Sequence, residues 1–127
     1  MSENPVREAI QAAIKDHEVI LFMKGTPERP MCGFSARTAA ALESLGAEYA
    51  AVDILPDPRI RQELSSISNW PTIPQLFVKG ELVGGCDIVT EMYESGELAT
   101  ALGVEQPSEA QAANAVEGAP LQIDNRL

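Results

Sequence analysis

The chain has 127 residues, of which 45% are hydrophobic, so it can bury one core of ordinary size but not two. Its net charge of −10 argues against binding to nucleic acid or to an anionic membrane, because both require Lys and Arg to neutralise phosphate. Two cysteines are too few for a disulfide scaffold, the start of the chain does not read as a signal peptide, and no stretch approaches the ~18 apolar residues of a membrane span, so we expect a cytoplasmic protein.

The first part of the chain predicts helix, strand, helix. Apolar residues follow Pro5 at helical spacing, which indicates an amphipathic helix. The run "VILFM" at 19–23 shows no alternation, and this is typical of a central strand covered on both faces. A second helix is expected over 34–46, where Gly46 would end it and Phe34 would lie on its buried side.

The second part predicts strand, helix, a hairpin and one or two closing helices. The strand covers 47–54, and the helix over 57–67 has an Asp-Pro start. Two short extended segments, 74–78 and 81–85, flank a Lys-Gly pair that suits a tight turn. The closing helices fall within 87–103.

This order predicts an α/β fold with a small mixed four-stranded sheet flanked by helices. The parallel pair needs a crossover helix, whereas the hairpin strands must be antiparallel. We assign residues 1–104 to one domain. Residues 105–127 lack aromatics and are rich in Ala, Glu, Gln, Pro and Gly, so we expect a disordered acidic tail.

The stretch "KGTPERPMCGFS" holds Cys32 at the boundary between a loop and a helix. Unpaired N–H groups and the positive end of the helix dipole should lower the pKa of this thiol, and Lys24 could approach it from the preceding strand. The alternative is that Cys32 is a small buried hydrophobe. Ser35 replaces the second cysteine of a C-x-x-C motif and cannot resolve a mixed disulfide.

The stretch "NWPTIPQLFV" carries two prolines before a strand. If the Ile73–Pro74 bond is cis, the N–H and C=O of Ile73 would face outward and offer a backbone edge to a peptide-like ligand. The alternative is two ordinary trans prolines in a loop. We expect Trp70 to belong to the core.

The stretch "GGCDIVTEM" opens a helix. Cys86 and Asp87 could present backbone donors to an anion, and Asp87 could pair with a ligand amine. Alternatively, the two glycines form a plain turn and Asp87 is an ordinary N-cap. Cys86 could be filler, a redox partner or a ligand.

Basic residues are concentrated in one part of this acidic chain. Arg59 and Arg61 lie in the first turn of their helix, where the dipole disfavours cations, so a nearby ligand carboxylate would explain them. The alternative is ordinary solvated helix surface. Five of the eight basic residues before the tail fall between positions 24 and 61: Lys24, Arg29, Arg37, Arg59 and Arg61.

The three stretches "KGTPERPMCGFS", "NWPTIPQ" and "GGCDI" together resemble the monothiol glutaredoxins of the CGFS type, and the resemblance covers about residues 5–104. The resemblance implies a thioredoxin fold and a glutathione site in which the ligand sulfur lies beside Cys32 and the ligand's cysteinyl backbone pairs with Ile73. It also implies two further sets of contacts: Lys24 and Arg61 with the glycine carboxylate, and Cys86 and Asp87 with the γ-glutamyl end.

The resemblance further implies a [2Fe-2S] cluster at the interface of a homodimer, BolA-like partners, cluster transfer to iron-sulfur apoproteins and a role in iron homeostasis. Such a cluster takes about four thiolates. Cys32 from two subunits and the sulfurs of two glutathiones would supply them. The rival function is a glutathione-dependent oxidoreductase that removes glutathione from mixed disulfides through Cys32. A third possibility is a Cys32–Cys86 disulfide.

Overall fold

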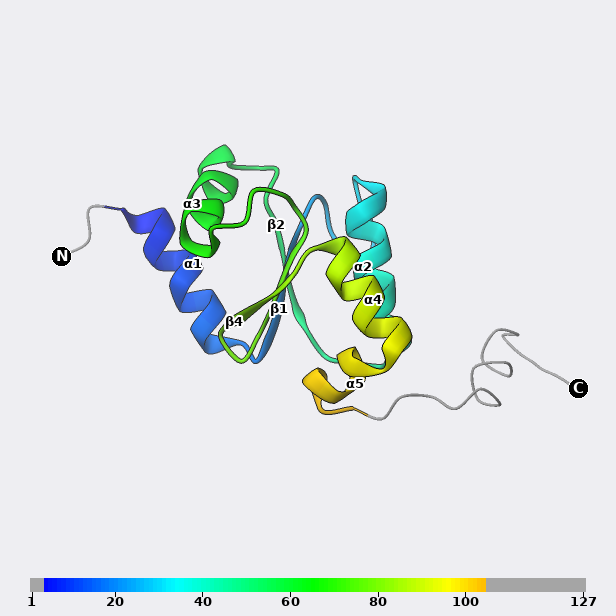
Figure 1. Cartoon of the computed structure of the whole chain (residues 1–127). Helices are drawn as coiled ribbons and strands as arrows, with labels where there is room; N and C mark the ends of the chain where they lie inside the picture. The colour runs from blue at the N-terminus through cyan, green and yellow to red at the C-terminus, as the bar shows by residue number, and fades with distance from the viewer. Residues whose placement is uncertain (1–3, 105–127) are drawn as a thin grey trace, which may run out of the picture.

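The computed structural model describes residues 4–104 as one four-stranded sheet between two layers of helices (Figure 1). All the predicted helices and strands are present, although the second strand is shorter than predicted. The expected disordered tail lies outside the described residues. In chain order the elements are α1 (Pro5–Asp16), β1 (Val19–Met23), α2 (Gly33–Ser44), β2 (Ala50–Asp53), α3 (Pro58–Ser68), β3 (Gln75–Val78), β4 (Glu81–Gly84), α4 (Cys86–Ser95) and α5 (Glu97–Leu102).

The sheet has the strand order β2-β1-β3-β4. β1 runs parallel to β2 and antiparallel to β3, and β3 forms a hairpin with β4. Lys79 and Gly80 turn this hairpin with φ values of 54° and 83°, as a two-residue turn between twisted strands requires. The predicted mixed sheet is therefore confirmed.

β1 is buried on both faces, as its sequence predicts. Leu21 and its alternate neighbours pack toward α2 and α4, whereas Ile20 and Phe22 pack toward α1 and α3. The ring of Phe22 meets that of Phe77 edge to face, with the ring centroids 5.8 Å apart. Full burial of each such side chain contributes about 1.5–3 kcal/mol relative to exposure. The two helical layers are thus held to opposite faces of one strand (Figure 1).

The strand directions bring several element ends to the same edge of the sheet. Because β3 is antiparallel to β1, its start lies beside the end of β1. β4 returns antiparallel to β3, so the start of α4 comes back to that edge. The stretches that contain Cys32, Ile73 and Cys86, which are far apart in the sequence, therefore lie close together at this edge. None of the helices within residues 4–104 has the length and apolar content needed to cross a membrane.

Candidate functional site

A groove of about 430 Å³ lies where these element ends meet. This volume is within the range of small-molecule sites, about 300–1,000 Å³. The groove brings together all six residues that the sequence predicts for the site: Lys24, Cys32, Arg61, Ile73, Cys86 and Asp87. The rest of its lining comes from Phe34, Trp70, Thr72, Pro74, Gly85 and Ile88. We call it the Cys32 groove.

Cys32 is the N-cap residue of α2 and is partly exposed to solvent. The backbone N–H of Ser35 lowers the pKa of the Cys32 thiol, and the N–H of Phe34 and the ammonium of Lys24 act in the same direction. Partial burial of the sulfur opposes this shift. The predicted effect of the helix start is confirmed in direction, and the alternative of a buried, inert Cys32 is wrong.

Backbone hydrogen bonds within residues 24–31 hold together the loop that precedes Cys32. Thr26 and Arg29 exchange two backbone hydrogen bonds of 3.2 and 3.0 Å, and Gly25 pairs with Pro30 as an isolated bridge. Gly25 has a φ of 87°, and a Cβ there would lie 2.4 Å from the carbonyl oxygen of Arg29. Only glycine fits this position, and the closed loop gives Cys32 a defined place at the start of α2.

Ser35 links two of the elements that form the site. Its side chain is fully buried, and its hydroxyl oxygen accepts a hydrogen bond of 3.0 Å from the backbone N–H of Lys24. The sequence interpretation treated Ser35 only as a missing thiol. In the structure this hydroxyl joins the end of β1 to the first turn of α2.

The Ile73–Pro74 peptide bond is cis, which sequence alone leaves open. The side chain of Ile73 is buried beside β1, and no hydrogen bond between described residues uses its backbone N–H or C=O. Gln75 anchors the turn, because its side-chain amide donates to the carbonyl oxygens of Trp70 and Thr72 at 3.0 and 3.1 Å. Ile73 therefore has a free backbone edge at the groove.

The start of α4 forms another part of the groove lining, next to the cis-proline turn. The N-cap is Gly85 and the helix begins at Cys86, so the alternative that Asp87 is the N-cap is wrong. Cys86 is only 8% exposed, and its sulfur lies 4.0 Å from the hydroxyl oxygen of Thr90. The side chain of Asp87 is exposed. The unpaired N–H groups of a helix start, together with this carboxylate, suit a ligand that carries both an anion and an amine.

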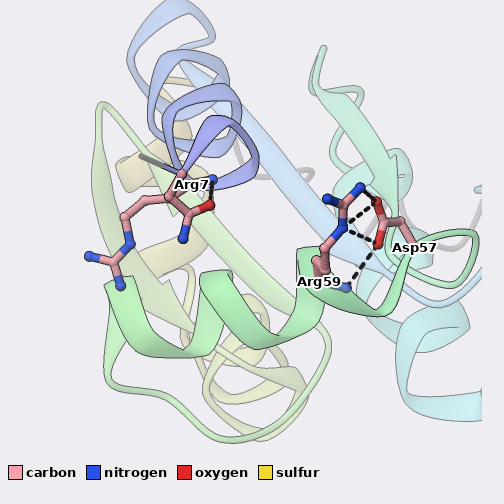
Figure 2. A network of polar contacts seen from close by, with 4 residues as sticks. Arg7, Asp57 and Arg59 are labelled. Atoms are coloured by element: carbon pink, nitrogen blue, oxygen red, sulfur yellow. Dashed lines mark hydrogen bonds and ion pairs between the residues drawn. The ribbon is translucent and has the colours of Figure 1, made fainter. Parts of the chain in front are cut away.

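Two of the five clustered basic residues reach the groove. The Lys24 side chain is half-buried, and the Arg61 guanidinium donates to the carbonyl oxygen of Pro71 at 3.4 Å. Arg59 instead lies 2.8 Å from Asp57, and its hydrogen bonds to that carboxyl lower the pKa of Asp57 (Figure 2). The Asp57 carboxylate therefore accounts for the cation at position 59, and no ligand carboxylate is needed to explain it. Arg29 and Arg37 are exposed and do not line the groove.

Two aromatic side chains depart from the sequence interpretation. Phe34, expected on the buried side of α2, is 55% exposed at the rim of the groove. Trp70, expected in the core, is half-buried and lines the groove, and its ring nitrogen has no hydrogen-bond partner within the described residues. Gly85 makes this position possible, because a Cβ there would lie 3.2 Å from that nitrogen. The indole of Trp70 lies so close to the backbone at position 85 that only glycine leaves enough room there.

Comparison with known proteins agrees with this geometry. The family model described as Glutaredoxin matches residues 19–83. A "Probable monothiol glutaredoxin 2" from Rickettsia felis is 53% identical over 98 residues, which cover 77% of this chain and 94% of that protein. The chain belongs to the monothiol glutaredoxin family. Glutaredoxin 4 of Escherichia coli K12 is 57% identical over 91 residues, which cover 72% of this chain and 79% of that glutaredoxin.

Solved glutaredoxins share the fold. The solution structure of a monomeric truncated mutant of Trypanosoma brucei 1-C-Grx1 superposes with a TM-score of 0.72 at 48% identity, covering 80% of this chain and 96% of the other. A buckwheat glutaredoxin–glutathione complex superposes with a TM-score of 0.69 at 25% identity, covering 77% and 87%. The predicted thioredoxin fold is confirmed.

Proposed function

We propose that the Cys32 groove binds glutathione and that two copies of the chain, each with one glutathione, hold a [2Fe-2S] cluster for transfer to iron-sulfur apoproteins. The observation that carries this proposal is the convergence of one ionisable thiol, one free backbone edge, two cations and one helix start in a single groove. Each of these groups answers a different part of glutathione.

The match can be followed along the tripeptide. Its glycine carboxylate pairs with Lys24 and Arg61, because charge-assisted hydrogen bonds to a carboxylate are stronger than neutral ones. Its cysteinyl backbone pairs with the N–H and C=O of Ile73, as an extended peptide adds to a strand edge. Its γ-glutamyl carboxylate lies at the N–H groups of Cys86 and Asp87, and its amine faces the Asp87 carboxylate. The buckwheat glutaredoxin–glutathione complex supports a tripeptide in this groove.

The cluster follows from a count of thiolates. A [2Fe-2S] cluster takes about four, and this chain has two cysteines, of which only Cys32 is partly exposed in the groove. Two copies and two glutathiones complete the set symmetrically. Two large apolar side chains that line the groove, Phe34 and Ile88, are exposed, and so is Met31, which precedes Cys32 in the chain. Exposed apolar side chains here suit a face that a second protein covers.

The partners and the location follow from the same proposal. Glutathione is abundant in a reducing cytoplasm, where two free thiols also persist. A BolA-like protein would occupy the place of the second copy by supplying two cluster ligands of its own, because one Cys32 and one glutathione supply only two of about four. Iron homeostasis would be the physiological setting.

The second candidate is removal of glutathione from protein mixed disulfides, which the lowered pKa of Cys32 favours. The Cys32 thiolate would attack the glutathione sulfur, release the protein thiolate and form a Cys32–glutathione disulfide. The thiolate of a second glutathione would then attack that glutathione sulfur, restore Cys32 and leave as glutathione disulfide. Both candidates use the same groove, and they differ in whether Cys32 serves as a ligand or as a nucleophile.

Anaerobic reconstitution with iron and sulfide, with and without glutathione, distinguishes them. We expect a coloured dimer, measured by absorption and size exclusion, that requires glutathione and Cys32 but persists in Cys86→Ser. A wild-type protein that stayed colourless and monomeric while rapidly reducing glutathionylated substrates would favour the oxidoreductase. Loss of the cluster in Cys86→Ser would contradict the ligand assignment.

A further inference from the structure

Asp53 lies outside the groove but is bonded to the segment that supplies Lys24. It is the last residue of β2, is half-buried and pairs with Met23 of β1. One of its carboxylate oxygens accepts hydrogen bonds from the N–H groups of Gly25, at 2.9 Å, and Leu55, at 3.0 Å. A single carboxylate oxygen thus links Gly25, which follows β1, to Leu55, which follows β2.

The two peptide groups that flank Lys24 have all four of their polar atoms bonded. The carbonyl oxygen of Met23 accepts from Ile54 at 3.0 Å, and the N–H of Lys24 donates to the Ser35 hydroxyl at 3.0 Å. The carbonyl oxygen of Lys24 accepts from Met31 at 2.9 Å. The N–H of Gly25 donates to Asp53. The direction in which the Lys24 side chain leaves the backbone is therefore fixed from both sides.

The hydrogen bond to Asp53 restrains the peptide group that leads into Gly25. Glycine as a residue type has more backbone conformations open to it than any other, and Gly25 is held here at a φ of 87°. The other three bonds hold Met23 and Lys24 but leave the N–H of Gly25 without a partner.

We propose that Asp53 is a positioning residue, whose carboxylate holds the Lys24–Gly25 backbone so that the Lys24 ammonium points to the carboxylate of the ligand. This inference rests on the proposed glutathione site. Asp53 touches neither glutathione nor Cys32, and it acts only through Lys24. Its contribution to binding must therefore disappear when Lys24 can no longer form the ion pair.

A double-mutant cycle on the full chain tests this coupling. Asp53→Ala and Asp53→Asn are made with Lys24 and with Lys24→Gln, and glutathione affinity is measured by calorimetry and by the fluorescence of Trp70, the sole tryptophan. We expect Lys24→Gln to weaken binding by about tenfold or more, as loss of a charge-assisted hydrogen bond does. Asp53→Ala should weaken binding about three- to tenfold with Lys24 present and less than about twofold in Lys24→Gln. Asp53→Asn keeps the acceptor oxygen and should remain within about twofold of wild type.

Two further measurements separate positioning from a general loss of stability. In the ligand-free protein, hydrogen exchange of the Gly25 amide should accelerate in Asp53→Ala and stay slow in Asp53→Asn. Asn4→Ala, which removes a comparable acceptor at the start of α1 (3.0 Å from the N–H of Arg7), should lower the melting temperature without changing the affinity.

The outcomes separate this inference from the function on which it rests. Equal loss of affinity from Asp53→Ala in both Lys24 backgrounds, or a large loss in Asp53→Asn, would overturn the positioning role while leaving the glutathione site intact. A wild-type protein that bound no glutathione would overturn the proposed function and the inference with it, even if Gly25 exchange behaved as expected.

Discussion

At the scale of single residues, Cys32 owes its acidity mainly to the backbone. The N–H of Ser35 is the largest cause of the lowered pKa, and Lys24 contributes less than the N–H of Phe34. The chain has one histidine, His17, which lies exposed at the far end of α1 and cannot serve Cys32 as a base. A thiol activated by a helix start needs no protonated neighbour, so it stays available as a ligand or as a nucleophile.

The pH dependence of alkylation tests this interpretation. In Cys86→Ser, the rate of reaction with iodoacetamide should rise with pH as Cys32 ionises, with a midpoint below the pKa of about 8.5 that an ordinary cysteine thiol has, because the pKa of Cys32 is lowered. The sign follows because the thiolate is the reactive form and a lowered pKa populates it at lower pH. Lys24→Gln should raise the midpoint only slightly, because the backbone donors remain. A midpoint at or above about 8.5 would contradict the role of the helix start.

Phe34 and Trp70 show where sequence reasoning stops at this scale. The apolar side chain of Phe34 predicts a place on the buried side of α2, but the buried face of this helix begins at Ser35 and continues through Thr38 and Leu42. Phe34 lies off that face and reaches the groove rim instead. An isolated tryptophan beside proline has no periodicity at all, and its place depends on Gly85, which is 15 residues away in sequence. Five of the six site residues were predictable because they lie in the three motif blocks. Arg61 lies outside those blocks, and its prediction rests on its place in the first turn of α3 and on the family resemblance.

At the scale of elements, the site is a consequence of strand direction. The end of β1, the start of β3 and the end of β4 meet at one edge because β3 is antiparallel to both of its neighbours. The sequence predicts part of this, since a crossover helix implies a parallel pair and a two-residue turn implies an antiparallel one, but it does not give the antiparallel pairing of β3 with β1. It could not predict the close contact between the start of α4 and the cis-proline turn. That contact depends on the absence of a side chain at Gly85.

Adding one methyl group at Gly85 tests this contact between elements. In Gly85→Ala the new Cβ would lie 3.1 Å from the carbonyl oxygen of Pro74 and 3.2 Å from the Trp70 ring nitrogen. We expect a loss of about 1–3 kcal/mol in the free energy of unfolding, as overpacking costs, together with weaker glutathione binding and altered Trp70 fluorescence.

Gly33→Ala is the matched control, because it makes the same substitution at the start of α2. A Cβ at Gly33 meets no atom within 4 Å, and alanine suits a helix better than glycine. Urea unfolding should show Gly33→Ala to be neutral or stabilised by up to about 1 kcal/mol. If both variants lost similar stability, the packing of α4 against the turn would not be the cause.

At the scale of the whole molecule, charge works against the proposed dimer. The chain carries a net charge of −10, of which −3 belongs to residues 105–127. Lys24 and Arg61 concentrate positive charge in the groove, whereas the exposed residues of α4 include Asp87, Glu91 and Glu94 and no cation. The groove therefore attracts an anionic tripeptide, while two copies of the chain repel each other over longer distances.

This repulsion predicts that salt strengthens the glutathione-dependent dimer. Between about 10 mM and 150 mM ionic strength the screening length falls from about 30 Å to about 8 Å, which removes repulsion between distant charges but leaves the ion pairs within the groove largely intact. Sedimentation of the reconstituted protein should show tighter dimers at the higher ionic strength. A chain that ends at Val104, with a net charge of −7, should show a smaller effect of salt. Dimers that dissociate as salt rises would instead indicate that ion pairs across the interface hold the two copies together.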